Sequence, residues 1–120
     1  MYEYKANLLR VIDGDTIEVD VDLGFGVWVR KQSMRLARIN APELKVVVDG
    51  HRVVNPAGTS AREWLEKVLL LESALGPITI ITIKDRLDKY GRMLVESMYS
   101  GDRKSINDEM VSAGFAVHVS

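Results

Sequence analysis

Residues 6–23 read ANLLRVIDGDTIEVDVDL, and the prediction of the fold starts from them. Its first half is rich in apolar residues up to Ile12, and Asp13-Gly14 then supplies the residues of a tight turn. Over residues 17–23, apolar side chains alternate with Glu and Asp, which is the period of a strand with one buried face. The stretch therefore predicts two strands joined by a short turn.

A third strand is predicted after Gly24-Phe25-Gly26, where two glycines bend the chain. Residues 27–39 are rich in Val, Met, Leu and Ile, as expected for a return strand. Phe25 and Trp28 lie at or next to this bend, and we expect both aromatic side chains to fold back onto the sheet.

One long amphipathic helix follows, because Asn55-Pro56 is typical of an N-cap followed by the first helical position. Its apolar residues fall at spacings of three and four up to Gly76-Pro77; they are Ala57, Ala61, Trp64, Leu65, Val68 and Leu71. Residues 46–54, just before the helix, are expected to form a β-hairpin.

The remaining chain predicts strands over residues 78–83 and 93–99, a short helix over 105–113 that Gly114 ends, and a last extended piece over 115–119. The order is three strands, a helix, two strands and a helix. This order predicts an α+β, mainly β fold: a five-stranded OB-fold barrel with a helix between strands 3 and 4 and a short C-terminal helix. A ferredoxin-like layout needs a helix after the first strand, and the Asp13-Gly14 turn leaves no room for one.

Composition limits the function classes. The 120 residues predict a single domain over 1–120, and no stretch approaches the ~20 apolar residues of a membrane span. The absence of Cys excludes thiol catalysis and Cys–zinc sites, and two His make a multi-histidine zinc centre improbable. The N-terminus lacks the layout of a signal peptide, so we expect a cytoplasmic monomer, or a secreted protein if a leader was removed.

Sixteen basic and 17 acidic residues give a formal charge of −1, so a nucleic acid could be bound only through local cations or a metal. Three polar segments offer such chemistry, at residues 13–16, 35–43 and 88–92. Each alone is explained as a turn, a strand end or a solvated loop. Together they supply carboxylates and an amide for a hard cation and guanidinium groups for a phosphate: Asp15, Asn40, Glu43, Arg35 and Arg92.

These segments resemble the staphylococcal nuclease (thermonuclease) family. The resemblance rests on residues 11–16 (VIDGDT), 35–43 (RLARINAPE) and 88–92 (DKYGR), with a weaker match over residues 109–116. Their order and spacing agree with the family over nearly all of the chain. The resemblance implies an OB-type barrel that cleaves DNA and RNA with Ca²⁺.

The resemblance also implies a role for each matching residue. Asp15, Asn40 and the Ala41 carbonyl would bind Ca²⁺, and Glu43 would position or activate the attacking water. Arg35 and Arg92 would grip the phosphate, while Lys89 and Tyr90 would line the pocket for the terminal phosphate and base. His51 and His118 match no family role, and we expect both to be solvated.

Position 40 departs from the family, which has an aspartate ligand where this chain has Asn40. We therefore expect weak Ca²⁺ binding, which a carboxylate at position 40 would improve about tenfold at a cost in metal-free stability. The alternative to an enzyme is a catalytically silent OB-fold module that binds nucleic acid or protein. Silent family members usually lose an arginine or the glutamate, and all three are present here.

Overall fold

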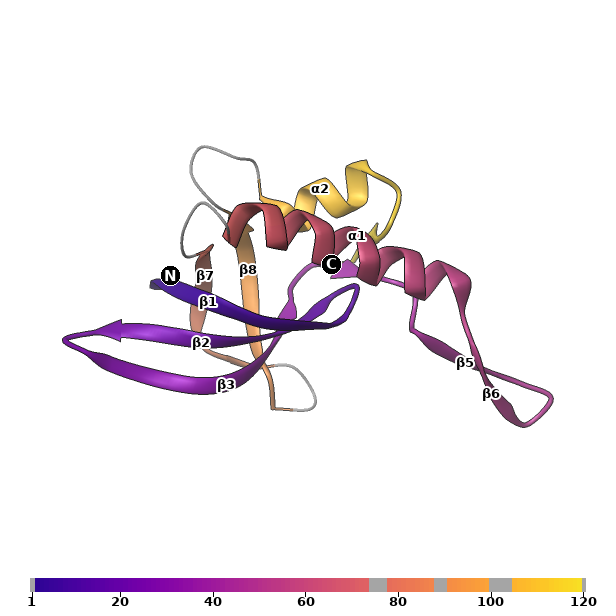
Figure 1. Cartoon of the computed structure of the whole chain (residues 1–120), viewed down its shortest axis with the longest axis horizontal. Coiled ribbons are helices and arrows are strands. Elements are labelled where there is room, and N and C mark those ends of the chain that lie inside the picture. The colour runs from indigo at the N-terminus through magenta and orange to yellow at the C-terminus, as the bar shows by residue number, and fades with distance from the viewer. Residues whose placement is uncertain (1, 74–77, 88–90, 100–104, 120) are drawn as a thin grey trace.

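Five strands close into a barrel in the order β1-β2-β3-β8-β7 (Figure 1). The strands are β1 (Tyr2–Asp13), β2 (Thr16–Gly24), β3 (Val27–Leu36), β7 (Ile78–Leu87) and β8 (Met93–Tyr99). Neighbouring strands are antiparallel except β3 and β8, which pair in parallel. The structure is a computed structural model that describes residues 2–73, 78–87, 91–99 and 105–119. The predicted five-stranded OB-type barrel is confirmed.

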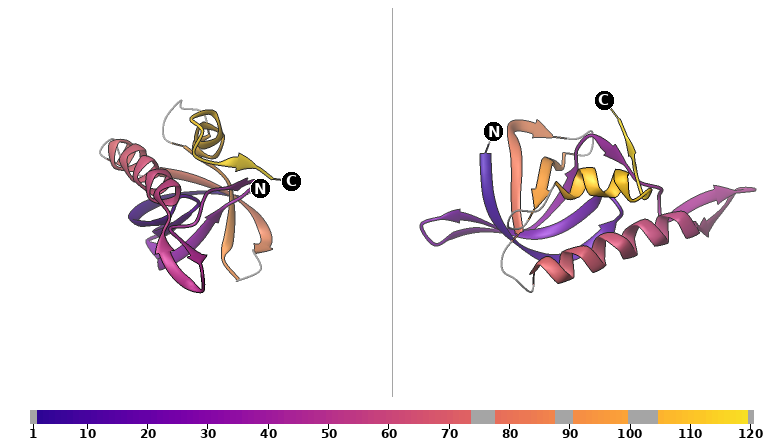
Figure 2. Two further views of the ribbon diagram at one scale, coloured as in Figure 1. Left: turned by 90° about the vertical axis from the view of Figure 1, so that its right-hand side faces the viewer. Right: turned by 90° about the horizontal axis from the view of Figure 1, so that it is seen from above.

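Two helices pack against this barrel, as Figure 2 shows from two directions. Helix α1 (Pro56–Ser73) contacts β1, and helix α2 (Ile106–Ser112) contacts β8. Asn55 precedes α1 as predicted, and its side-chain oxygen accepts a hydrogen bond from the backbone N–H of Ala57 at 3.3 Å. The predicted helix end near Gly76-Pro77 lies outside the described residues. No helix within the described ranges is both long and apolar enough to cross a bilayer.

Two short sheets complete the fold. Strands β4 (Ile39–Asn40) and β9 (Val117–His118) pair, and β5 (Lys45–Val48) pairs with β6 (His51–Val54) as the predicted hairpin. The third strand was expected to run to residue 39, but β3 ends at Leu36. The chain turns at Ala37 and Arg38, where Arg38 has a φ of 63°, and resumes as β4.

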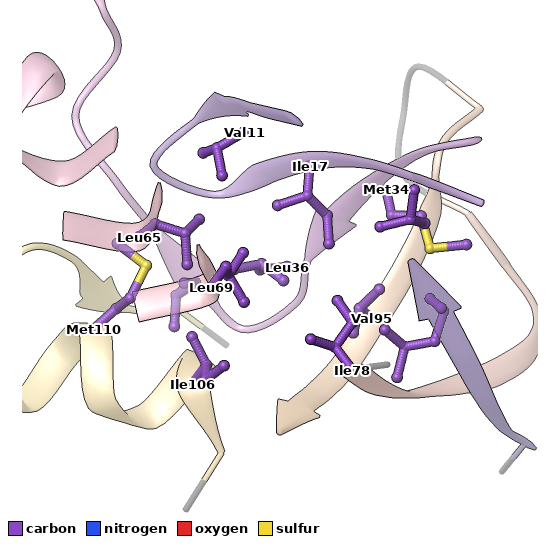
Figure 3. Close-up of a cluster of buried hydrophobic side chains, with 14 of the residues drawn as sticks. Val11, Ile17, Met34, Leu36, Leu65, Leu69, Ile78, Val95, Ile106 and Met110 are labelled. Atoms are coloured by element: carbon purple, nitrogen blue, oxygen red, sulfur yellow. The ribbon is translucent and has the colours of Figure 1, made fainter. Parts of the chain in front are cut away.

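The core is formed by side chains of the barrel strands together with those of the two helices that pack on them (Figure 3). Val11 and Ile17 come from the first two strands, Leu65 from α1, and Ile106 and Met110 from α2. Each is at most 2% exposed, so each contributes about 1.5–3 kcal/mol through burial of its apolar side chain. The prediction that Ala57 belongs to the apolar face of α1 is wrong: Ala57 is exposed, and its neighbour Gly58 is the residue of the first turn that packs against the chain, at the Glu43 carbonyl.

The prediction for Phe25 is also wrong, since its side chain is fully exposed at 106%. The β2–β3 ribbon runs beyond the barrel (Figure 1), so its tip has no sheet surface to fold onto. Gly24, Phe25 and Gly26 all have positive φ values, of 85°, 57° and 76°. Trp28 is half-buried, and the Arg30 guanidinium lies 4.9 Å from the centre of its ring.

A buried amide joins α2 to the seam between β3 and β8. Asn107 is 3% exposed, and its Nδ2 donates to the carbonyls of Ala37 and Val95 at 3.1 Å and of Glu96 at 3.3 Å. The backbone N–H of Ala37 also donates to Val95 at 2.8 Å. These contacts secure the parallel junction that closes the barrel.

A bulge in the β2–β3 ribbon is held by Asp20. One carboxylate oxygen accepts the backbone N–H of Lys31 at 2.9 Å, and the other accepts from Arg30 at 3.1 Å. Lys31 has a φ of 53°, a left-handed conformation that a non-glycine residue needs support to hold. The Lys31 N–H, followed by Arg30, lowers the pKa of Asp20 below its ordinary 3.8.

We predict that Asp20→Asn lowers the melting temperature at pH 7, and that this difference from the parent shrinks in acid. Because the pKa of Asp20 is lower in the folded than in the unfolded chain, its charged form stabilises the fold above pH 3.8. That contribution is lost as the pH falls through the folded-state value. Thermal melts from pH 7 to pH 2.5 measure this, with Glu63→Gln as a control that removes one exposed charge from α1. Equal pH profiles for the two variants would contradict the role of Asp20.

Candidate functional site

Asp15 is the centre of the polar cluster at the turn between β1 and β2. It is 8% exposed, and one oxygen, Oδ2, accepts the backbone N–H of Ala41 at 2.9 Å and lies 3.2 Å from Nη2 of Arg35. The other oxygen accepts from the Thr16 hydroxyl at 3.2 Å. The carboxylate thus ties the turn to the end of β3 and to the segment after β4.

The guanidinium nitrogen Nη2 of Arg35 contacts several oxygen atoms. Its Nη2 lies 3.2 Å from Asp15 Oδ2 and 3.0 Å from both the Ile39 carbonyl and Asn40 Oδ1. Its Nη1 donates to the carbonyl of Leu36. Three oxygens from three residues therefore converge on a single cationic nitrogen.

Arg92 reaches the same cluster from the start of β8. Its Nη1 donates to the Thr16 hydroxyl at 3.2 Å, and Thr16 is only 2% exposed. Since the same hydroxyl donates to Asp15, Thr16 links the carboxylate to the second guanidinium. The parallel pairing of Arg35 with Leu94 explains why Arg92, two residues earlier, lies at the same end of the barrel.

Asp13 and Glu43 add negative charge to the cluster. Burial raises the pKa of Asp13 above its ordinary 3.8, and the carboxylates of Asp15 and Glu43 raise it further. Arg92 and Arg62 oppose this rise. Charges shift a pKa in this way only when they lie close to the titrating group. Asp13 therefore lies in one electrostatic group with Asp15, Glu43, Arg62 and Arg92.

Close backbone contacts hold the acidic segment against α1. A Cβ added to Gly58 would lie 2.0 Å from the carbonyl oxygen of Glu43, so only glycine allows this approach. Asn55 Nδ2 donates to the same carbonyl at 2.9 Å. A Cβ added to Gly14 would lie 2.8 Å from the Cβ atoms of Ala41 and Ala61. The helix thereby fixes the position of the turn and of the backbone at Glu43.

The donor atoms suit a hard divalent cation. Asp15 and Asn40 offer oxygens that already meet around a cation, the guanidinium of Arg35. In the part of the chain that the structure describes, no three Asp, Glu, His or Cys side chains are grouped closely enough to hold a metal. A metal here would therefore need amide, backbone carbonyl or water oxygens as well.

The structure brings together most of the residues that the sequence singled out. Those that meet are Asp15, Arg35, Asn40, Ala41, Glu43 and Arg92. Lys89 and Tyr90 lie outside the described residues. His51 and His118 are exposed, as expected.

Sequence reasoning missed three members of the cluster. Asp13 was explained as a turn residue and Thr16 had no assigned role, although both belong to the Asp-Gly-Asp-Thr motif that marked the site. Arg62 gave no local signal, because a single cation on the polar face of a helix is ordinary. In the fold its Nε donates to the Val11 carbonyl at 3.1 Å, which brings it beside the motif.

Comparison with known proteins relates the chain to one family. The model of the family "Staphylococcal nuclease homologue" matches residues 33–120. The thermonuclease of Staphylococcus hyicus is 28% identical over 114 residues, which are 95% of this chain. The chain spans 59% of the length of that curated relative.

We predict that Thr16→Val lowers the free energy of unfolding by about 1–3 kcal/mol, because it leaves the buried carboxylate of Asp15 and the half-buried guanidinium of Arg92 without their shared hydroxyl. Thr16→Ser, which keeps the hydroxyl, should lower the free energy of unfolding much less. Thr79→Val is the matched control: Thr79 is 4% exposed, but its hydroxyl accepts from Lys5, an exposed residue that water can solvate. Urea unfolding of the three variants measures the difference. A Thr16→Val loss no larger than that of the control would show that the link to Asp15 and Arg92 contributes nothing.

Proposed function

The chain belongs to the staphylococcal nuclease homologue family, and from this premise we propose that it hydrolyses phosphodiester bonds in DNA or RNA with Ca²⁺, without sequence specificity. The observation that carries the proposal is the meeting of Asp15, Arg35 and Arg92 at one end of the barrel. Arg35 contacts Asp15 directly, and Arg92 contacts it through Thr16. Carboxylates and guanidinium groups in one cluster suit a reaction at an anionic phosphorus centre.

The ion would be held by the Asp15 carboxylate, the Asn40 amide oxygen and the Ala41 carbonyl. When bound, a divalent cation supplies positive charge that stabilises the phosphate oxygens during hydrolysis. The oxygens of Asp15 and Asn40 meet at a guanidinium nitrogen, which supports their capacity to hold a cation together. The backbone N–H of Ala41, bonded to Asp15, keeps the Ala41 segment beside that carboxylate.

The two arginines would bind the phosphate and stabilise the charge that grows on it. A guanidinium is always charged and presents two N–H groups in one plane, which matches two phosphate oxygens. Arg35 is only 17% exposed, and it is fixed by the carbonyls of Leu36 and Ile39 as well as by Asp15. Because Nη2 of Arg35 now contacts the oxygens that the ion would take, those contacts would be exchanged for the phosphate when ion and substrate bind, while the carbonyls of Leu36 and Ile39 keep the guanidinium at the site.

Glu43 would orient the attacking water and accept its proton. Its side chain is exposed, so water and substrate can reach it, while its backbone is fixed by Asn55 and by the close approach of Gly58. A carboxylate that reaches solvent from a rigid backbone can act as a general base. Lys89 and Tyr90 would hold the terminal phosphate and base of the substrate. A chain of net charge −1 would depend on these local groups to bind nucleic acid.

We expect single-stranded or duplex DNA or RNA to be cleaved in Ca²⁺ and left intact in a chelator. Glu43→Gln should keep oligonucleotide binding but lose most of the rate, by about 10²-fold or more, because an amide cannot take a proton. Gel assays with end-labelled substrates measure cleavage, and fluorescence anisotropy measures binding.

Glu63→Gln is the matched control, since Glu63 is exposed on α1 and contacts none of the site residues described above. Cleavage that survives the chelator would overturn the metal mechanism. Binding without cleavage by the parent would instead support a catalytically silent OB-fold module. If the Glu43→Gln variant is as active as Glu63→Gln, Glu43 does not accept the proton of the attacking water.

We predict that Asn40→Asp lowers the Ca²⁺ concentration for half-maximal activity about tenfold, since a carboxylate offers Ca²⁺ a full charge where the amide offers a dipole. The structure changes the expectation for metal-free stability. Arg35 Nη2 lies 3.0 Å from Asn40 Oδ1, so a carboxylate there gains an ion pair that offsets repulsion from Asp15. Calcium titrations and metal-free melts test both points. An unchanged calcium midpoint would show that position 40 does not face the ion.

A further inference from the structure

The hairpin of residues 45–54, here called the valine hairpin, projects from the body of the molecule beyond the N-terminal end of α1 (Figures 1 and 2). All eight of its strand residues are exposed, and five of them are valines: Val46, Val47, Val48, Val53 and Val54. A lone two-stranded hairpin is only marginally stable in water, and unpaired apolar strand edges favour association with another strand.

The geometry of the valine hairpin is well defined. Asp49 and Gly50 have φ values of 50° and 79°, as a type I′ turn requires, and Val48 pairs with His51 on either side of them. Val46 pairs with Val53, and Val47 with Arg52. This register decides which backbone groups are used inside the hairpin and which point away from it.

On β5, the backbone N–H and C=O groups that point away from β6 belong to alternate residues. The backbone N–H of Asn55 donates to the Leu44 carbonyl at 2.8 Å, so positions 44 and 55 form a hydrogen-bonded pair. In an antiparallel ladder such pairs alternate, which makes Val46–Val53 and Val48–His51 the next ones. The N–H and C=O groups of Lys45 and Val47 therefore point outward along the free edge, and the turn residue Asp49 follows at the tip of the valine hairpin.

This edge is complementary to itself. When two β5 strands pair antiparallel about Val47, each Val47 bonds to its counterpart, and Lys45 of one copy meets Asp49 of the other. The outward backbone groups of Val47 are then satisfied, and opposite charges meet at both ends. The pairing also places Val46 of each copy beside Val48 of the other on one face of the sheet.

The opposite edge of the valine hairpin has no such match. By the same alternation, the outward groups of β6 belong to Arg52 and Val54. Pairing about Arg52 would oppose two cations, and pairing Arg52 with Val54 would gain no charge contact. The two edges therefore differ, and β5 is the one suited to a second copy.

We propose that the protein forms a two-fold symmetric dimer in which two valine hairpins join through their β5 edges into a four-stranded sheet. An interface of this kind uses the same surface on both copies, as two-fold symmetry requires. The proposal does not depend on nuclease activity. The sequence predicted a monomer instead, and the experiment below decides between the two predictions.

Charge reversal tests the pairing. We expect sedimentation velocity of the parent to show a concentration-dependent dimer. Lys45→Asp or Asp49→Lys alone should weaken the dimer about tenfold or more, because each places like charges at both ends of the paired strands. The double variant Lys45→Asp/Asp49→Lys should recover the dimer, and a mixture of the two single variants should form mixed dimers. Lys67→Asp, on the exposed face of α1, is the matched control and should leave the dimer unchanged.

Circular dichroism melts show whether each variant is folded. A parent that sediments as a monomer up to millimolar concentration would overturn the proposal. So would a folded Lys45→Asp variant that dimerises as tightly as the parent, since this change leaves the turn intact. A monomeric parent whose oligonucleotide binding falls in Lys45→Asp would instead assign the valine hairpin to nucleic acid.

Discussion

The carboxylate of Asp15 is the contact on which the site depends. It is buried at the turn between the first two strands, and it joins a backbone N–H of the segment after β4, a guanidinium of β3 and a hydroxyl of β2. A buried carboxylate is stable only when its charge is compensated in this way. Because Ala41, Arg35 and Thr16 all meet it, the positions of the other polar groups follow from its own.

Two glycines bring α1 close enough to support this arrangement. Gly14 lies between Ala41 and Ala61, and Gly58 lies against the Glu43 carbonyl, at distances that exclude a side chain. Helix α1 thus fixes the position of the backbone over residues 40–43, which carries the acidic and amide groups. A substitution at either glycine would move whole backbone segments, because the groups it would meet include backbone or buried Cβ atoms that cannot rotate away.

Much of this could be predicted from local patterns. Alternation in residues 17–23 and the Asp13-Gly14 turn gave the first hairpin, and Asn55-Pro56 gave the start of α1. The motifs gave the polar residues of the site. The failures came where a contact between distant segments decides the outcome. Phe25 is exposed because its ribbon extends beyond the barrel, which local pattern does not reveal.

The electrostatic grouping at the site could not be predicted for the same reason. Arg62 joins it only through the docking of α1 against the Val11 carbonyl, and Thr16 links Asp15 to Arg92 only when β8 pairs beside β3. The Arg35 contact of Asn40 likewise changed the expected effect of a carboxylate at that position. The sequence motifs identify the polar residues of the site, but the packing of distant segments determines which of these residues contact one another.

The junction secured by Asn107 bears on how the chain folds. The first three strands are joined by short turns and can pair as soon as they are made, but β3 finds its last partner only when β8 arrives from far along the chain. Pairing across such a separation is slow, since the loss of chain entropy comes before the contacts form. Until then the edge of β3 stays open to strands of other molecules. The closing of this seam therefore sets a period, during synthesis or refolding, in which the half-made barrel is most prone to aggregate.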